Sequence, residues 1–206
     1  MRTSPELTAQ IRANYERVRA EVGPDVTVVA ATKYAAPDEM ALLADAGIEV
    51  VGENRLQDLV AKHAELGDRF RWHFIGHLQS RKAKEVSQLC ELVHSLDSLS
   101  AAKRLSAPAL VEVNLGGEES KSGVSREQLP GFLSEVRELG VEVRGLMTMP
   151  PLAEDPERSR PYFRELRELA GEHGFRELSM GSSQDYRVAA EEGATLIRVG
   201  SVLFGR

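Results

Sequence analysis

Cysteine is almost absent from this chain of 206 residues, which contains a single one, Cys90. One thiol excludes an internal disulfide framework and a cysteine-based zinc site. Cys90 follows Leu89 in a helical pattern, and free cysteine usually behaves as a small hydrophobic side chain, so we expect it to be buried or half-buried. The chain is long enough to bury an apolar core without covalent cross-links.

Long apolar runs are also missing, and no stretch approaches the roughly 20 apolar residues of a membrane helix. The N-terminus, MRTSPELTAQIRANYERVRAEVG, lacks the apolar core of a signal peptide. We therefore expect a cytoplasmic protein with no membrane partner. The formal net charge of −6 gives no support to a nucleic-acid partner, although a local basic pocket for one small anion is compatible with it.

Two familiar catalytic patterns are lacking as well. His73 and His77 are four residues apart, but a predicted strand contains His73 and Gly76 interrupts the run. Without an HExxH pattern or a third ligand, this pair does not predict a zinc site, and we expect no bound metal. The chain has no GxSxG elbow, which disfavours a Ser-His-Asp hydrolase.

The repeated unit of the chain is a short β-rich run, followed by a turn signal and, in most cases, by an amphipathic helical segment. Clear helical segments occupy residues 37–47, 54–67, 78–90 and 156–174. The eight predicted strands are VTVVAA at 26–31, IEVVG at 48–52, RWHFIG at 71–76, LVHSL at 92–96, ALVEVNL at 109–115, VEVRGLM at 141–147, RELSM at 176–180 and LIRVG at 196–200.

Strands that alternate with helices indicate parallel pairing with right-handed crossovers. Eight units predict an α/β fold, a single (β/α)8 barrel of the TIM type over residues 1–206, with an extra N-terminal helix at about 5–21. Ser125 and Gln128 form a capping-box candidate for the helix before the sixth strand. An open, doubly wound sheet is the rival architecture.

Lys33 is the sharpest single feature. The chain has six lysines against twenty arginines, and Lys33 alone follows a buried, β-branched run. Side chains at the carboxyl ends of barrel strands converge on one face. We expect Lys33 to lie near the barrel axis, where removal from water favours the neutral amine that imine formation needs. The alternative is a lysine that extends from a strand end into solvent.

Two turns rich in glycine and serine suggest an anion site. SMGSS at 179–183 follows the seventh predicted strand, and VGS at 199–201 follows the eighth. Small residues let backbone amides approach a phosphate closely, and barrels often bind phosphate after these two strands. The simpler interpretation is that glycine and serine only make tight turns there.

Arg198 lies inside the last predicted strand, where an unpaired charge is costly. It therefore needs a partner. A pyridine nitrogen is one candidate, and a structural carboxylate such as Glu112 is the other.

Taken together, these stretches resemble the pyridoxal 5′-phosphate (PLP) homeostasis family, also called the proline synthase co-transcribed or PLP-binding protein family. This family is similar in fold to the N-terminal barrel of alanine racemases, a fold-type III PLP fold. The matching motifs are AATKY around Lys33, VGENRLQD at 51–58, WHFIGHLQSRKAK at 72–84, HSLDS at 94–98, VEVNLGGEESKSG at 111–123, RGLMTMPP at 144–151, LSMGSSQDY at 178–186 and IRVGSVLFGR at 197–206.

The resemblance implies PLP as cofactor and assigns a role to each matching position. Lys33 would carry the cofactor as a Schiff base, and Arg198 would face the pyridine nitrogen. Asn54 and Met147 would line the ring pocket. Ser182 stands where the family usually has methionine. The residues implied to cradle the phosphate are Ser182, Ser183, Gly200 and Ser201.

The same resemblance bears on catalysis. An arginine opposite the pyridine nitrogen would keep it unprotonated and weaken the ring as an electron sink. Racemases with this barrel also use a tyrosine from a second, β-rich domain, which we do not find in these 206 residues. Racemisation by two bases needs acid/base groups on both faces of the cofactor. The sequence thus predicts a PLP carrier in vitamin B6 homeostasis without catalytic turnover.

The partners implied by the resemblance are PLP and, as recipients, apo forms of PLP-dependent enzymes. The helix patterns leave no long apolar stripe for an obligate interface, which favours a monomer. A weak amino-acid racemase or lyase is the first alternative function. The second is a phosphosugar-binding barrel enzyme that uses a general-acid lysine and no cofactor.

Overall fold

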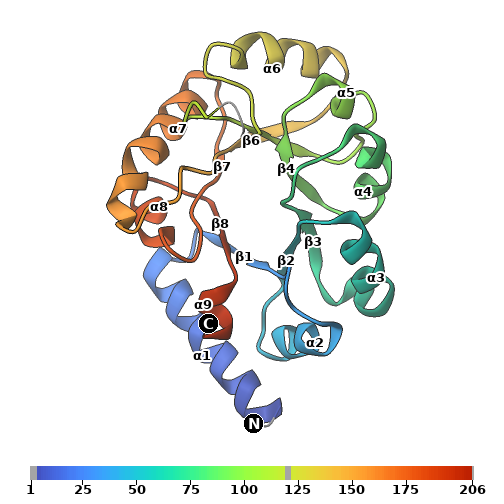
Figure 1. Ribbon diagram of the computed structural model, residues 1–206, viewed down its shortest axis with the longest axis vertical. Coiled ribbons are helices and arrows are strands. Elements are labelled where there is room, and N and C mark those ends of the chain that lie inside the picture. The colour runs from blue at the N-terminus through green and yellow to red at the C-terminus, as the bar shows by residue number, and fades with distance from the viewer. Residues whose placement is uncertain (1–3, 119–121, 206) are drawn as a thin grey trace.

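The computed structural model describes residues 4–118 and 122–205. Eight parallel strands pair in sequence order, and the last pairs with the first, which closes a barrel (Figure 1). This confirms the predicted (β/α)8 fold and rules out the open sheet. The strands are β1 Thr27–Ala31, β2 Val50–Glu53, β3 Arg71–Phe74, β4 Leu92–Leu96, β5 Ala109–Glu112, β6 Val143–Met147, β7 Glu177–Ser179 and β8 Leu196–Val199.

Helices surround the strands on the outside of the barrel (Figure 1). The predicted N-terminal helix is confirmed as α1. The α-helices of the described residues are α1 Ser4–Val22, α2 Pro37–Asp45, α3 Leu56–Leu66, α4 Ala83–Leu89, α5 Leu99–Ala102, α6 Leu129–Glu138, α7 Arg160–Glu172, α8 Tyr186–Glu191 and α9 Ser201–Phe204. Three short 3-10 helices are η1 Gly67–Arg69, η2 Ser80–Lys82 and η3 Pro156–Ser159.

Local sequence explains where several helices begin and end. α2 begins at Pro37, whose missing N–H costs nothing in a first helical turn. The side chain of Glu39 accepts a hydrogen bond from the Ala36 N–H at 3.1 Å. The capping box before α6 is also present: the Gln128 N–H donates to Ser125 Oγ at 3.3 Å, and the Ser125 N–H donates to Gln128 Oε1 at 3.0 Å.

The apolar core has two layers, because successive residues of a strand face opposite sides of the sheet. In β1, Val28 and Ala30 pack outward against the helices, whereas Val29 points into the barrel. Cys90 belongs to the outer layer, as expected, and burial raises the pKa of its thiol to about 12. The inner layer consists of Val29, Val50, Ile75, Leu92, Leu110, Met147 and Leu196.

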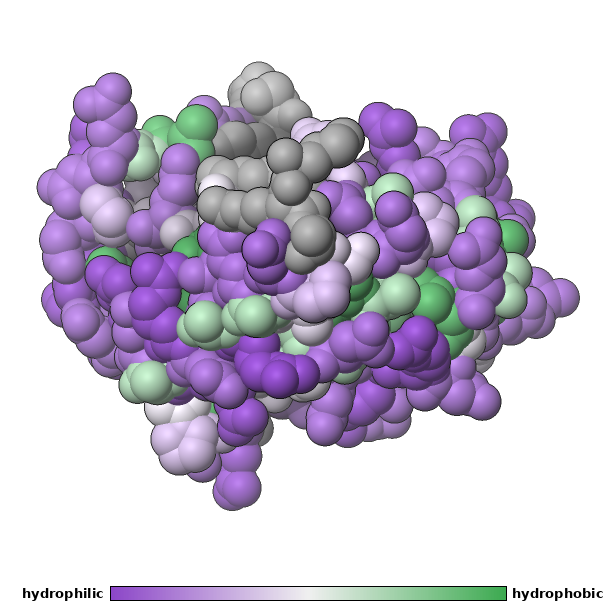
Figure 2. Space-filling model, turned by 90° about the horizontal axis from the view of Figure 1, so that it is seen from below, coloured by the Kyte–Doolittle hydropathy of each residue, from purple (hydrophilic) through white to green (hydrophobic). Residues whose placement is uncertain are grey.

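One face of the outer surface is mainly polar. The face seen in Figure 2 is mostly hydrophilic, and its hydrophobic side chains form small patches separated by polar ones. Within residues 4–118 and 122–205, no helix combines the length and the apolar character that crossing a membrane requires.

The first and last helices of the described chain lie against each other. α9 lies beside α1 (Figure 1), and the Asn14 side chain donates a hydrogen bond to the Leu203 carbonyl at 3.0 Å. In the same region Arg187, on α8, forms an ion pair with Glu21 at 2.6 Å. α1 therefore braces the part of the barrel formed by β8 and the helices after β7 and β8.

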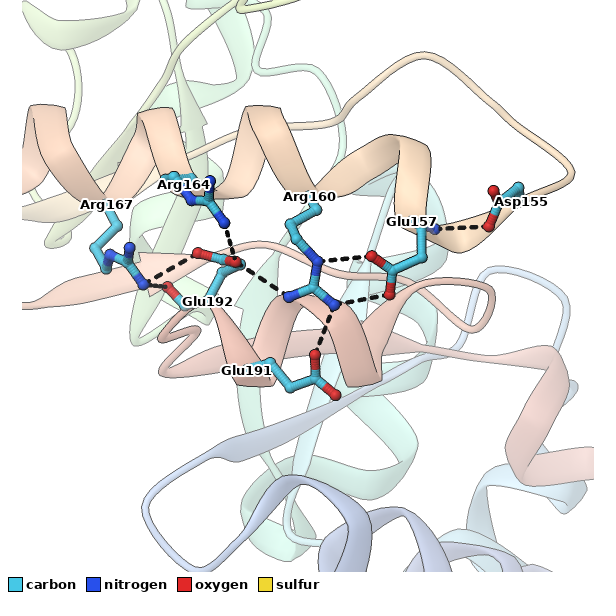
Figure 3. Close-up of polar contacts among 7 residues, drawn as sticks. All are labelled: Asp155, Glu157, Arg160, Arg164, Arg167, Glu191 and Glu192. Atoms are coloured by element: carbon cyan, nitrogen blue, oxygen red, sulfur yellow. Dashed lines mark hydrogen bonds and ion pairs between the residues drawn. The ribbon is translucent and has the colours of Figure 1, made fainter.

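Arginines on α7 bind acidic side chains of α8 and its end (Figure 3). The central group is the buried carboxylate of Glu192, which lies 3.1 Å from nitrogens of Arg160, Arg164 and Arg167. Arg160 also pairs with Glu157 and Glu191. Because these contacts join two neighbouring helices, they hold the C-terminal end of α8 against α7.

Candidate cofactor site

The eight residues implied in cofactor binding all lie at or near the carboxyl ends of strands. β1 pairs with β8 in a register that sets Ala30 opposite Val199, so the segment after β1 runs beside the loop after β8. A side chain at Gly200 would meet the Ala31 carbonyl oxygen at 3.1 Å, which shows how closely these two strand ends approach. The tertiary structure thus brings the Lys33 segment next to the loop of Gly200 and Ser201.

Lys33 itself is exposed, and its Nζ lies 4.8 Å from the ring centroid of Tyr34. This differs from the expected position near the barrel axis and out of water. The reason is that β1 ends at Ala31, so the long side chain of Lys33 extends past the rim of the barrel. Solvent and soluble amines can therefore reach the Lys33 amine directly.

A buried ion pair anchors the residue before Lys33. Lys62 Nζ lies 2.6 Å from Glu53 Oε1 and donates to the Thr32 carbonyl at 2.7 Å. The Thr32 hydroxyl donates to the same Glu53 oxygen at 2.5 Å. We did not predict this group, although the i, i+3, i+7 spacing of Leu59, Lys62 and Leu66 places Lys62 on the apolar face of α3.

Arg198 points into the barrel and is buried. Its guanidinium donates to the Ser179 hydroxyl and to the Thr148 carbonyl, the latter at 3.1 Å. The proposed ion pair with Glu112 is absent from the described contacts, because the neutral oxygens of β7 and the β6 end occupy the guanidinium instead. Burial lowers the pKa of Arg198 to about 10, so this side chain is charged at neutral pH.

Glu112, on β5, faces the same cavity, and its charge acts on Arg198. Burial raises the pKa of its carboxyl to about 7, with a further increase from the Asp97 charge and a decrease from Arg198. A carboxyl group near its pKa and a charged guanidinium thus share one pocket.

The loops after β7 and β8 are tied together by hydroxyl groups. The Gly200 N–H donates to Ser183 Oγ at 3.0 Å. Both the N–H and the hydroxyl of Ser182 donate to Asp185 Oδ1, at 2.7 and 2.9 Å. The other oxygen of Asp185 accepts from Ser159 at 2.8 Å. Ser182, which replaces the usual methionine, therefore directs its donors toward Asp185, whereas Ser201 is exposed beside the loop.

Asn54 and Met147 differ in burial. Met147 is a buried member of the inner apolar layer and contributes to the floor beneath the mouth. Asn54 is half-buried just after β2. A side chain at Gly76 would lie 2.1 Å from the Asn54 carbonyl oxygen, so the glycine of WHFIGH permits the close approach of these two strand ends.

A cavity of about 470 Å³ opens beside Arg198. Its walls come from the ends of β5, β7 and β8 and from the loop after β6, including Glu112, Asn114, Pro151, Gly181, Ser182 and Arg198. This volume falls within the range of about 300–1,000 Å³ typical of small-molecule sites. Of the eight predicted residues, Ser182 and Arg198 line it, and the other six lie outside it.

Comparison with known proteins places the chain in a family. Residues 8–206 match the family described as alanine racemase, N-terminal domain. A pyridoxal phosphate homeostasis protein of Aquifex aeolicus is 43% identical over 195 residues, 86% of each chain. A protein of the same name from Deinococcus radiodurans is 40% identical and covers 97% of this chain and 98% of its own.

Solved structures agree with this placement. PipY of Synechococcus elongatus, solved without PLP, has a TM-score of 0.88 and 34% identity, covering 95% of this chain and 100% of its own. The same protein with PLP bound has a TM-score of 0.87 and 33% identity, with the same coverage. Alanine racemase from Corynebacterium glutamicum shares the fold, with a TM-score of 0.75 at 17% identity over 95% of this chain and 60% of its own. The chain therefore belongs to the alanine racemase N-terminal domain family, and within it to the pyridoxal phosphate homeostasis proteins.

Proposed function

We propose that this protein binds PLP, holds it as a Schiff base on Lys33, and serves intracellular vitamin B6 homeostasis without catalytic turnover of its own. One observation carries the proposal. The pairing of β1 with β8 sets the Lys33 segment beside the Gly200 loop, at the barrel end where Arg198 lines a cavity. An amine can bind the aldehyde of PLP, a cluster of hydroxyl and amide donors its phosphate, and a guanidinium its pyridine nitrogen.

We assign a group at this end of the barrel to each part of PLP. Bound PLP supplies an aldehyde that condenses with primary amines. Ser183, Gly200 and Ser201 would receive the phosphate, and the Gly200 N–H would then donate to the phosphate in place of Ser183 Oγ. Ser182 would bind the phosphate only if its N–H and hydroxyl no longer donate to Asp185. Asn54 and Met147 would contact the ring.

Arg198 supports a holding role over a catalytic one. Because the guanidinium is charged at neutral pH, it would donate a hydrogen bond to the pyridine nitrogen and leave that nitrogen unprotonated. An unprotonated pyridine withdraws electrons weakly, which disfavours the carbanion chemistry of transaminases.

The exposure of Lys33 also suits a carrier. A cofactor on a lysine that water and amines can reach exchanges more readily than one enclosed in a core. We propose apo PLP-dependent enzymes as recipients and the cytoplasm as the location. A weak racemase or lyase is the alternative, and turnover of an amino acid that disappears in Lys33→Ala would favour it.

The test uses the purified protein. We expect PLP, added and then passed through gel filtration, to leave a retained yellow band. Borohydride reduction followed by peptide mapping should place the label on Lys33. Lys33→Ala should lose both signals, whereas Lys103→Ala, a change at an exposed lysine far along the chain, should keep them. No retained band, or a label scattered over several lysines, would refute the proposal and turn attention to phosphorylated sugars.

A further inference from the structure

Four polar side chains fill a region of the barrel interior that is usually apolar. They are His73 on β3, His94 on β4, Ser179 on β7 and Arg198 on β8, and each is at most 8% exposed. His73 Nδ1 lies 2.9 Å from His94 Nε2, and His94 Nδ1 lies 2.8 Å from Ser179 Oγ. Ser179 in turn accepts from Arg198. The chain of contacts thus crosses the barrel from β4 to β7.

The direction of these hydrogen bonds follows from the chemistry of Arg198. A guanidinium has only donors, so Ser179 Oγ must accept from it. The hydroxyl hydrogen of Ser179 then needs an acceptor, and His94 Nδ1 is the partner within reach. With Nδ1 as acceptor, a neutral His94 carries its hydrogen on Nε2 and donates it to His73 Nδ1.

The opposite direction fits poorly. If His94 Nδ1 carried the hydrogen, two donors would converge on Ser179 Oγ beside a positive charge. The Ser179 hydroxyl hydrogen would then lack an acceptor among the described residues. Burial lowers the pKa of His73 to about 4 and that of His94 well below its usual value, so both rings are neutral at pH 7. Each hydrogen bond of the chain is therefore donated in the direction that leads from Arg198 to His73.

We infer that His94 and Ser179 are positioning residues that hold Arg198 for the ring of the cofactor, with His73 completing the chain. This inference rests on the proposed function. One terminal nitrogen of Arg198 is bound by Ser179 and the other by the Thr148 carbonyl. Two fixed nitrogens set the plane of the guanidinium. The oxygens that bind it keep its charge inside the barrel. One side of the Arg198 side chain borders the cavity.

The first test needs no cofactor. Ring ¹⁵N chemical shifts of labelled protein at pH 7, assigned with His73→Gln and His94→Gln, report which nitrogen carries the hydrogen. We expect the Nε2–H form for both His73 and His94. Ser179→Ala should shift the His94 signals, and Ser87→Ala, which removes a half-buried hydroxyl outside the barrel, should not. An Nδ1–H form or a charged ring at His94 would overturn the inference.

The second test uses PLP-loaded protein. Ser179→Ala should weaken PLP binding about tenfold, the effect of one lost hydrogen bond to a charged group, and should shift the visible absorption band of the bound cofactor. Ser179→Thr keeps the hydroxyl and should restore both, and Ser87→Ala should change neither. If Ser179→Ala binds PLP as tightly as the wild type and has the same visible absorption band, the inference is contradicted. Failure of the wild type to retain PLP would instead refute the proposed function, and the ring shifts would still decide the direction of the chain.

Discussion

At the scale of single residues, the buried ion pair of Lys62 and Glu53 is an interaction that we did not predict. Both are buried beneath the Lys33 segment, and Glu53 Oε2 has no hydrogen-bond partner among the described residues. Removing ions from water is costly, and such a pair stabilises a fold only while both partners are present. Its role here is to fix Thr32, because Lys62 and Glu53 each bond to that residue.

We expect Lys62→Met to lower the free energy of unfolding by about 3–5 kcal/mol, because it leaves the Glu53 charge buried and unpaired. Urea denaturation measures this change. Lys84→Met, at an exposed position of α4, should stay within about 0.5 kcal/mol of wild type. The double variant Glu53→Gln/Lys62→Met should be more stable than Lys62→Met alone. A double variant less stable than Lys62→Met would contradict a pairwise interaction.

Glu112 should make stability depend on pH. Its pKa in the folded protein, about 7, lies above the ordinary value of 4.5, so the folded state keeps a proton that the unfolded chain releases. The contribution of Glu112 therefore decreases as pH rises from about 4.5 to about 7. We expect the free energy of unfolding of Glu112→Gln, relative to wild type, to increase across this range. A difference that does not vary with pH would show that Glu112 titrates normally.

Among the secondary-structure elements, α6 offers the cleanest test of local sequence. Its capping box satisfies the N–H groups of Ser125 and Gln128 with side-chain oxygens. Ser125→Ala should destabilise the protein by about 0.5–1 kcal/mol, at the low end for a cap because the site is exposed. Ser134→Ala, at an exposed position inside α6, serves as the control and should not destabilise. Equal effects of the two changes in thermal unfolding would argue against the cap.

The loop between β7 and α8 shows how neighbouring elements organise the candidate site. Asp185 receives hydrogen bonds from Ser182 and Ser159, so it joins this loop to η3. The arginines of α7 then bind Glu192 at the end of α8. The Asp185 bonds fix the loop directly, and the arginine contacts fix the far end of the helix that follows it, so both suit a phosphate site that is formed before its ligand arrives.

At the scale of the whole molecule, closure of the barrel brings the parts of the candidate site together. β1 and β8 are separated by most of the chain, yet their pairing sets the amine of Lys33 and the loop of Gly200 at one end. Neither segment alone could hold a cofactor that has an aldehyde at one side of its ring and a phosphate at another. We therefore expect PLP retention to be lost together with the fold in urea.

We predict a monomer in solution. The helix patterns leave no long apolar stripe, and the face in Figure 2 carries only small hydrophobic patches. Size-exclusion chromatography with light scattering should give a mass of about 22.7 kDa, that of one chain. A mass near twice this value, unchanged on dilution, would require an interface that the sequence pattern does not indicate.

Much of the architecture follows from the sequence alone. The runs of β-branched and apolar residues predicted all eight strands, because a parallel strand covered on both faces is almost continuously apolar. The capping box and the N-terminal helix were predicted from local patterns for the same reason: their contacts lie within one or two helical turns. The motifs also placed Lys33, Arg198 and the two glycine-rich turns at strand ends.

Other features were decided by tertiary structure. His94 bonds to Ser179, 85 residues away, and Lys62 reaches Thr32, 30 residues away. The sequence shows each of these side chains but not its partner, since the partner depends on which strands face each other across the closed barrel. The exposure of Lys33 was only the alternative to the expected buried position, and the neutral partners of Arg198 were not foreseen. Local sequence determined the strands, helices and caps, because those contacts are short in range, whereas the closed barrel alone decided which buried charges and hydroxyls meet.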